Sequence, residues 1–189
     1  MEGQEKPIFR LVQGRSHSEI WMGGVRIFVA PEEMPPFVAE ALVAEEDTFL
    51  VLSADPELHD MEETPERIIA EIASAEPMNP GSVIARGDNP LQMLAIVHDL
   101  NEEPSWREEW VEKALEEIFR MAQVRRLSSL ALPLLGTLHG TMAKDRFLAL
   151  LQEAIEKNPP VSLKRLWLVA SRGTASEILT LLKSKAEER

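Results

Sequence analysis

The sequence of 189 residues contains no cysteine and no tyrosine. Without cysteine there are no disulfides, no thiolate nucleophiles and no cysteine-ligated zinc sites. Without tyrosine, no phenol serves as a general acid. No two of the four histidines stand at the spacing of a zinc-binding helix, so no metal site is predicted. Walker, Rossmann and nucleophile-elbow motifs are missing as well, and we expect no cofactor.

Long apolar runs are also missing, because no stretch approaches the roughly eighteen residues of a membrane span. Residues 1–6 are polar and do not resemble a secretory signal, so we expect a cytoplasmic protein with no membrane partner. Basic residues are outnumbered, and the formal net charge is −12. Such a charge repels phosphate backbones and argues against a nucleic-acid partner. A bound anion would depend on local backbone N–H groups.

What the sequence does contain is an alternation of β-rich and helical patterns from residue 48 onward. We expect strands at 48–54, 82–86, 93–100, 127–134 and 163–170, and helices at 65–75, 106–122, 144–157 and from 174. Ser105 with Glu108, and Thr174 with Glu177, have the capping-box spacing that starts a helix. This order predicts the α/β class, as a three-layer α/β/α sandwich with a mixed, largely parallel central sheet.

The first thirty residues have a different pattern. Strands are expected at 7–12, 19–22 and 25–30, and the last two flank a Gly23-Gly24 turn typical of a hairpin. We expect residues 1–30 to pack on the sheet edge of a single compact domain whose main body is 31–189. A short helix is expected at 37–44.

Ligands of such sheets bind beyond the carboxyl ends of the strands, which selects the loops after Ala54 and Pro133. The second loop carries Gly136 and Gly140 around Thr137, and glycine permits close backbone approach. Its N–H groups and Thr137 are suited to a phosphate. An ordinary strand-to-helix turn that needs glycine explains the pattern equally well. The predicted ligand-binding residues are Ser53, Leu135, Gly136, Thr137, Leu138, His139 and Gly140.

The region 128–140, SSLALPLLGTLHG, resembles the macro-domain family, whose members bind ADP-ribose and related nucleotides. In that family a strand ends in proline, and a Gly-Thr-Gly-type loop and a further glycine follow. The segments 80–83 and 96–98 are similar to the family's Pro-Gly turn and Ile-Ile-His strand end. The resemblance covers roughly residues 48–170 and implies a nucleotide or ADP-ribose-type ligand.

The family's Val-Asn-Ala-Ala-Asn signature aligns with residues 51–55, where Leu52 and Asp55 replace the two asparagines. No glycine-rich loop follows, and Leu138 replaces the middle glycine of the second loop. The family's Gly-Asp-Ile-Thr motif has no counterpart at 25–33.

Two further candidates are catalytic. Asp55 with His59 is suited to activating a water as a general base, although Asp55-Pro56 is also typical of a turn. His98 ends a buried strand, where a hydrogen-bonded structural role is the better interpretation.

Three functions follow from these observations. The first is a module that binds a nucleotide such as ADP-ribose at the loop after Pro133. The second is a macro-like scaffold for protein interaction or homo-oligomerisation, which has a precedent in the non-catalytic domain of leucine aminopeptidases. The third is a hydrolase of ADP-ribosyl bonds or ADP-ribose phosphates, and whether the chain is an enzyme stays open at this point.

Overall fold

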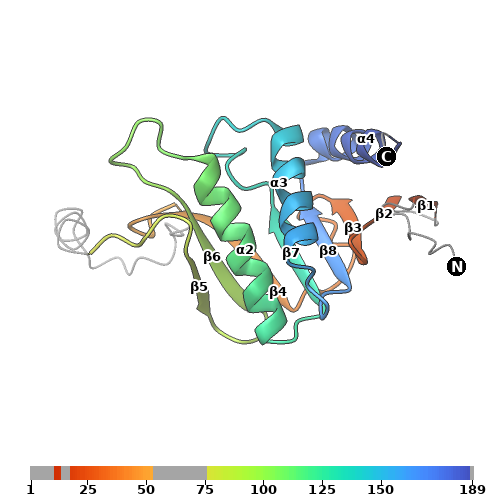
Figure 1. Ribbon diagram of the computed structural model, residues 1–189, viewed down its shortest axis with the longest axis horizontal. Helices are drawn as coiled ribbons and strands as arrows, with labels where there is room; N and C mark the ends of the chain where they lie inside the picture. Colours follow the sequence, from red (N-terminus) through yellow and green to blue (C-terminus); the bar gives the residue numbers. More distant parts are fainter. Residues whose placement is uncertain (1–10, 14–17, 53–75, 188–189) are drawn as a thin grey trace, which may run out of the picture.

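The computed structural model describes residues 11–13, 18–52 and 76–187 (Figure 1). Its strands form one eight-stranded sheet in the order β1-β2-β3-β8-β7-β4-β6-β5. The strands are β1 (Leu11–Gln13), β2 (Ser18–Met22), β3 (Val25–Ala30), β4 (Ala41–Asp47), β5 (Val83–Arg86), β6 (Leu91–His98), β7 (Ser129–Pro133) and β8 (Arg165–Val169). The described helices are α2 (Glu108–Val124), α3 (Lys144–Lys157) and α4 (Arg172–Glu187).

The centre of the sheet is parallel. Strand β3 pairs with β8, β8 with β7, β7 with β4 and β4 with β6, all in the parallel sense. The hairpin of β2 and β3 adds antiparallel pairing on one side, and β5 pairs antiparallel with β6 on the other. The predicted α/β class with a mixed, largely parallel sheet and an N-terminal hairpin is confirmed.

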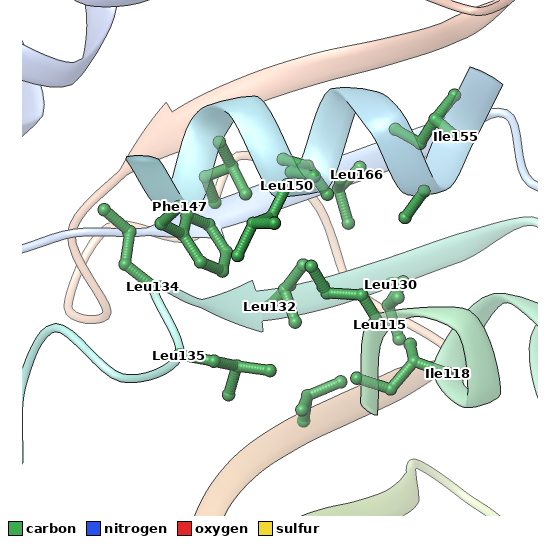
Figure 2. Close-up of a cluster of buried hydrophobic side chains, with 14 of the residues drawn as sticks. Leu115, Ile118, Leu130, Leu132, Leu134, Leu135, Phe147, Leu150, Ile155 and Leu166 are labelled. Carbon is green, nitrogen blue, oxygen red and sulfur yellow. The ribbon is translucent and has the colours of Figure 1, made fainter. Parts of the chain in front are cut away.

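The three described helices pack on one face of this sheet (Figure 1). Along α2 the buried residues recur at helical spacing, from Trp110 through Ala114 and Ile118 to Ala122. Leu130 and Leu132 of β7 lie between α2 and α3 and are fully buried (Figure 2). Burial of a leucine or isoleucine side chain contributes about 1.5–3 kcal/mol, so this cluster is the main source of stability.

The opposite face is crossed by residues 31–40, which connect β3 to β4. Phe37 and Ala39 pack there against Ala131 and Trp167, and the ring of Phe37 meets that of Phe28 edge to face. The predicted helix at 37–44 is wrong. From Ala41 the chain pairs with both β6 and β7, and these ladders override the helical spacing of its apolar residues.

The strand predicted at 48–54 is also wrong, because the strand in question is β4 and ends at Asp47. The Asp47 carboxylate accepts the N–H groups of Phe49, Val51 and Leu52, which turns the chain immediately after the strand. Leu50 has a φ of 60°, which no strand residue adopts. The Asp47 side chain therefore ends β4, although the apolar residues that follow it are typical of a strand.

Both capping boxes were misplaced, although the helices exist. Trp106 bridges to His98 across the sheet edge, so α2 begins only at Glu108 and has no side-chain cap. Helix α4 begins at Arg172, which puts Thr174 inside its first turn, where the hydroxyl bonds to the Ser171 carbonyl. The helix expected at 65–75 lies outside the described residues. In the described ranges, none of the helices has the length and apolar character needed to cross a membrane.

Candidate ligand site

Three parallel strands end side by side at the candidate site. Strand β4 lies between β7 and β6, and the three end at Asp47, Pro133 and His98. The ladder between β4 and β6 continues to the pair Asp47–His98. The ladder between β4 and β7 covers only Ala41 and Leu42, so these two strands are no longer paired toward their carboxyl ends. Ligands of open α/β sheets bind in the crevice outside the carboxyl ends of the strands.

The loop after β7 has a fixed shape. Gly136 has a φ of +75°, which favours glycine, and its carbonyl accepts the N–H of Met142. The N–H and hydroxyl of Thr137 both donate to the Leu134 carbonyl, at 3.1 and 2.7 Å. Thr137 is thus used to hold the turn, and its hydroxyl is already engaged.

Gly140 is the point of closest contact in this loop. A Cβ at Gly140 would overlap the Gly136 carbonyl oxygen and come within 2.9 Å of the Trp106 ring. The indole N–H of Trp106 donates to the Thr141 hydroxyl at 3.3 Å, which fixes the ring against the loop. The predicted need for glycine at this position is therefore explained by packing.

Three backbone amides of the loop differ from those that hold its shape. No described residue accepts a hydrogen bond from the N–H of Leu138, His139 or Gly140. Both the Leu138 and the His139 side chains are exposed. Successive free N–H groups in a loop are a recognised arrangement for binding an anion.

Beside this loop, Glu45 of β4 is buried and uses both carboxylate oxygens. One oxygen bonds to Nε2 of His98, and the other accepts the N–H of Gly136 at 3.0 Å. His98 is 1% exposed and Glu45 is 8% exposed. The predicted hydrogen-bonded structural role of His98 is confirmed, and its ring also meets that of His139 edge to face.

The two residues after Glu45 hold the turn on the β4 side of the site. Glu46 and Asp47 are fully buried. Their carboxylates accept the N–H groups of the turn that follows, including two bonds from Leu52 at 2.7 and 2.9 Å. The N–H groups of Phe49, Val51 and Leu52 are therefore occupied by carboxylates of the chain itself, and they are not free for a ligand anion.

The predicted residues divide into two groups. Gly136, Thr137, Leu138, His139 and Gly140 lie together at the carboxyl end of β7. Leu135 stands in the same loop, but its side chain is fully buried in the core (Figure 2). Ser53, Asp55 and His59 lie outside the described residues.

The alignment of the family signature with residues 51–55 was misplaced, because the strand that should carry it ends at Asp47. Sequence reasoning consequently missed Glu45, Glu46 and Asp47. A signal existed, since three acids in succession directly follow the apolar run ALVA. Acids at that position are expected to face a binding site or to be buried with partners. Trp106 was also placed on a helix, whereas it precedes α2 and covers the loop.

A separate hollow of about 840 Å³ lies along α2 and shares no lining residue with this site. Its charged residues are largely paired with one another, as in the contacts of Arg120 with Glu117 and of Lys157 with Glu116. Over the described residues, no group of three or more metal-ligating side chains is present.

No family model matches the sequence, and no curated protein matches it either. Solved structures do match. The Oceanobacillus iheyensis macrodomain, solved with ADP, has a TM-score of 0.67 at 15% identity and covers 92% of this chain and 98% of its own. The macrodomain of Mycobacterium tuberculosis DarG has a TM-score of 0.55 at 16% identity over 78% of this chain and 100% of its own.

The macro domain of ganglioside induced differentiation associated protein 2 has a TM-score of 0.55 at 11% identity, with 84% of each chain covered. At such identities the likeness concerns the backbone. Together with the sheet order and the position of the glycine loop, it establishes that this chain has the macrodomain fold.

Proposed function

We propose that this chain binds a nucleotide or ADP-ribose-type ligand at the loop after β7. The observation that carries the proposal is the set of three amides, Leu138, His139 and Gly140, which have no acceptor among the described residues. They lie at the carboxyl ends of parallel strands, where nucleotides bind in open α/β sheets. Structures of the same fold have been solved with ADP and with ADP-ribose, which supports the ligand class.

A phosphate at these amides would be held locally, against the net charge of −12. Backbone N–H groups and the exposed imidazole of His139 are the donors on this side. On the β4 side the carboxylates of Glu45 and Asp47 would repel a second phosphate. We therefore expect one phosphate contact, on the β7 side of the site.

The hydrolase alternative depends on Asp55 and His59, which lie outside the described residues, and it stays a prediction. If Asp55 activates water, Asp55→Ala abolishes hydrolysis of an ADP-ribosyl substrate and leaves its binding intact. Turnover that persists in this variant would contradict the assignment.

A second candidate function is a scaffold that binds protein or self-associates. The observation in its favour is that apolar side chains are exposed around the same strand ends, with Leu138 76%, Leu100 55% and Val51 39% exposed. Under this function, Leu138→Ser weakens self-association in sedimentation experiments. Under nucleotide binding it leaves the phosphate contact unchanged, because that contact uses the backbone.

The location of the ligand is tested by following backbone amide resonances during titration with ADP-ribose. We expect saturable shifts at Leu138, His139 and Gly140. Matched titrations with adenosine, which lacks phosphate, should leave these three amides unmoved. Shifts confined to other surfaces, or none at all, would contradict the proposed site.

A further inference from the structure

Strands β4 and β7 are paired only near their amino ends, which leaves a space between them toward their carboxyl ends. Their ladder stops after Leu42, whereas β7 remains paired with β8 as far as Pro133. Pro133 also lacks an N–H group to donate toward β4. The N–H of Gly136, just beyond the end of β7, is therefore directed at a space that the sheet itself leaves unfilled.

Glu45 fills that space from the other side. Its carboxylate stands between the Gly136 amide, at 3.0 Å, and the imidazole of His98. The side chain is 5% exposed and that of His98 is 1% exposed, so both partners are shielded from bulk solvent. An imidazole and a backbone N–H facing one oxyanion from opposite sides are the kind of donors that hold a phosphate or a carboxylate.

The Gly136 amide is fixed and cannot turn to another acceptor. Its φ of +75° sets the direction of the N–H, and the Val111 side chain lies 3.3 Å from the position of a Cβ. The Met142 bond to the Gly136 carbonyl fixes the next peptide group. The Gly136 side of the subsite is therefore held by contacts that do not involve Glu45.

We infer that Glu45 is an internal anion that occupies an oxyanion subsite formed by the Gly136 amide and His98, and thereby excludes a ligand phosphate or carboxylate from it. Glu45 is thus a specificity-determining residue. The occupied subsite does not depend on nucleotide binding. Its consequence for ligand choice rests on the proposed function: the chain accepts one phosphate at Leu138–Gly140 and rejects a second at Gly136.

The experiment removes the carboxylate and supplies it again from solution. Glu45→Ala empties the subsite and should lower the midpoint of thermal unfolding, and acetate, formate or inorganic phosphate should raise that midpoint with saturation. Wild type and Glu45→Gln, whose amide oxygen still accepts the Gly136 N–H, should not respond to these anions. Sodium chloride at equal ionic strength is the control for salt.

An unfolding midpoint of Glu45→Ala that does not respond to the three anions would overturn the inference. A second measurement uses the wild type and does not depend on the folding of Glu45→Ala. With phosphate, the amide resonance of Gly136 should stay fixed, while Glu45→Gln should shift that resonance by changing its acceptor. Movement of the Gly136 amide when phosphate is added to wild type would show that the subsite is open, and the inference would be wrong.

Failure here is distinguishable from failure of the proposed function. If the wild type binds no nucleotide but anions raise the unfolding midpoint of Glu45→Ala, the subsite is supported and the proposed nucleotide binding is wrong. If the wild type binds ADP-ribose and phosphate shifts the Gly136 amide resonance, nucleotide binding is supported and the role of Glu45 as an internal anion is wrong. If nucleotide binding and the role of Glu45 are both correct, Glu45→Ala should bind ADP about tenfold more tightly than the wild type, because one charged hydrogen bond is added.

Discussion

A single methyl group at Gly140 tests how the loop after β7 is built. In Gly140→Ala the new Cβ would overlap the Gly136 carbonyl oxygen and lie 2.9 Å from two atoms of the Trp106 ring. That carbonyl also accepts the Met142 N–H, which closes the loop. Neither a backbone oxygen nor a ring packed against backbone can give way cheaply, so the loop itself has to move.

The cost follows from these contacts. Overpacking a closely packed position costs about 1–3 kcal/mol, and loss of the closing hydrogen bond falls within the same range. We expect the free energy of unfolding to fall by about 2 kcal/mol, which for a chain of this size lowers the midpoint by about 4–8 °C. Because the free amides share the distorted loop, nucleotide affinity should fall by about tenfold or more.

Gly173→Ala is the matched control, since the same methyl group is added where no atom lies within 4 Å. Gly173 is in the first turn of α4, so alanine should stabilise the protein there by about 0.5 kcal/mol. Urea unfolding of the two variants measures both values. If Gly140→Ala is as stable as the wild type and binds nucleotide equally well, the packing argument for this loop is refuted.

Other predictions concern the hairpin and the pH dependence of stability. Gly23→Ala should cost about 1–3 kcal/mol more than Gly24→Ala, because both have positive φ but only the Cβ at Gly23 would overlap Ile155; equal losses in urea unfolding would contradict this. The N–H and hydroxyl of Ser128 lower the pKa of Glu40 below its ordinary value of 4.5. The stability from Glu40 is therefore fully present above that value and is lost as pH falls. Glu40→Gln should destabilise by about 0.5 kcal/mol at neutral pH and by nothing in acid, and a loss that is the same in acid would refute the assignment.

Much of the fold was predictable because its signals are local and repeated. Helix α3 was predicted with its observed bounds, since Phe147, Leu148, Leu151 and Ile155 recur on one face. The Gly23-Gly24 hairpin was predictable because the turn needs positive φ at both positions. These features depend on residues close in the sequence, where periodicity and turn chemistry are reliable guides.

The errors arose where distant partners decide the structure. Residues 37–44 have helical spacing, but β6 and β7, which lie far along the chain, bind Ala41 and Leu42 as strand. The apolar run after Thr48 is turned by the Asp47 carboxylate, a bond that composition does not indicate. Glu45 was missed for the same reason, since its partners His98 and Gly136 are 53 and 91 residues away.

Calorimetric titration of the protein with ADP-ribose tests most directly whether the glycine loop after β7 is a working nucleotide site. ADP and AMP give the comparison, and Gly140→Ala gives the control for location. We predict saturable binding at micromolar to millimolar strength in the wild type and a weaker affinity in Gly140→Ala. No heat at millimolar ligand, or equal binding by the variant, would contradict nucleotide binding at this loop. It would favour a scaffold that binds protein through the exposed apolar side chains around the strand ends.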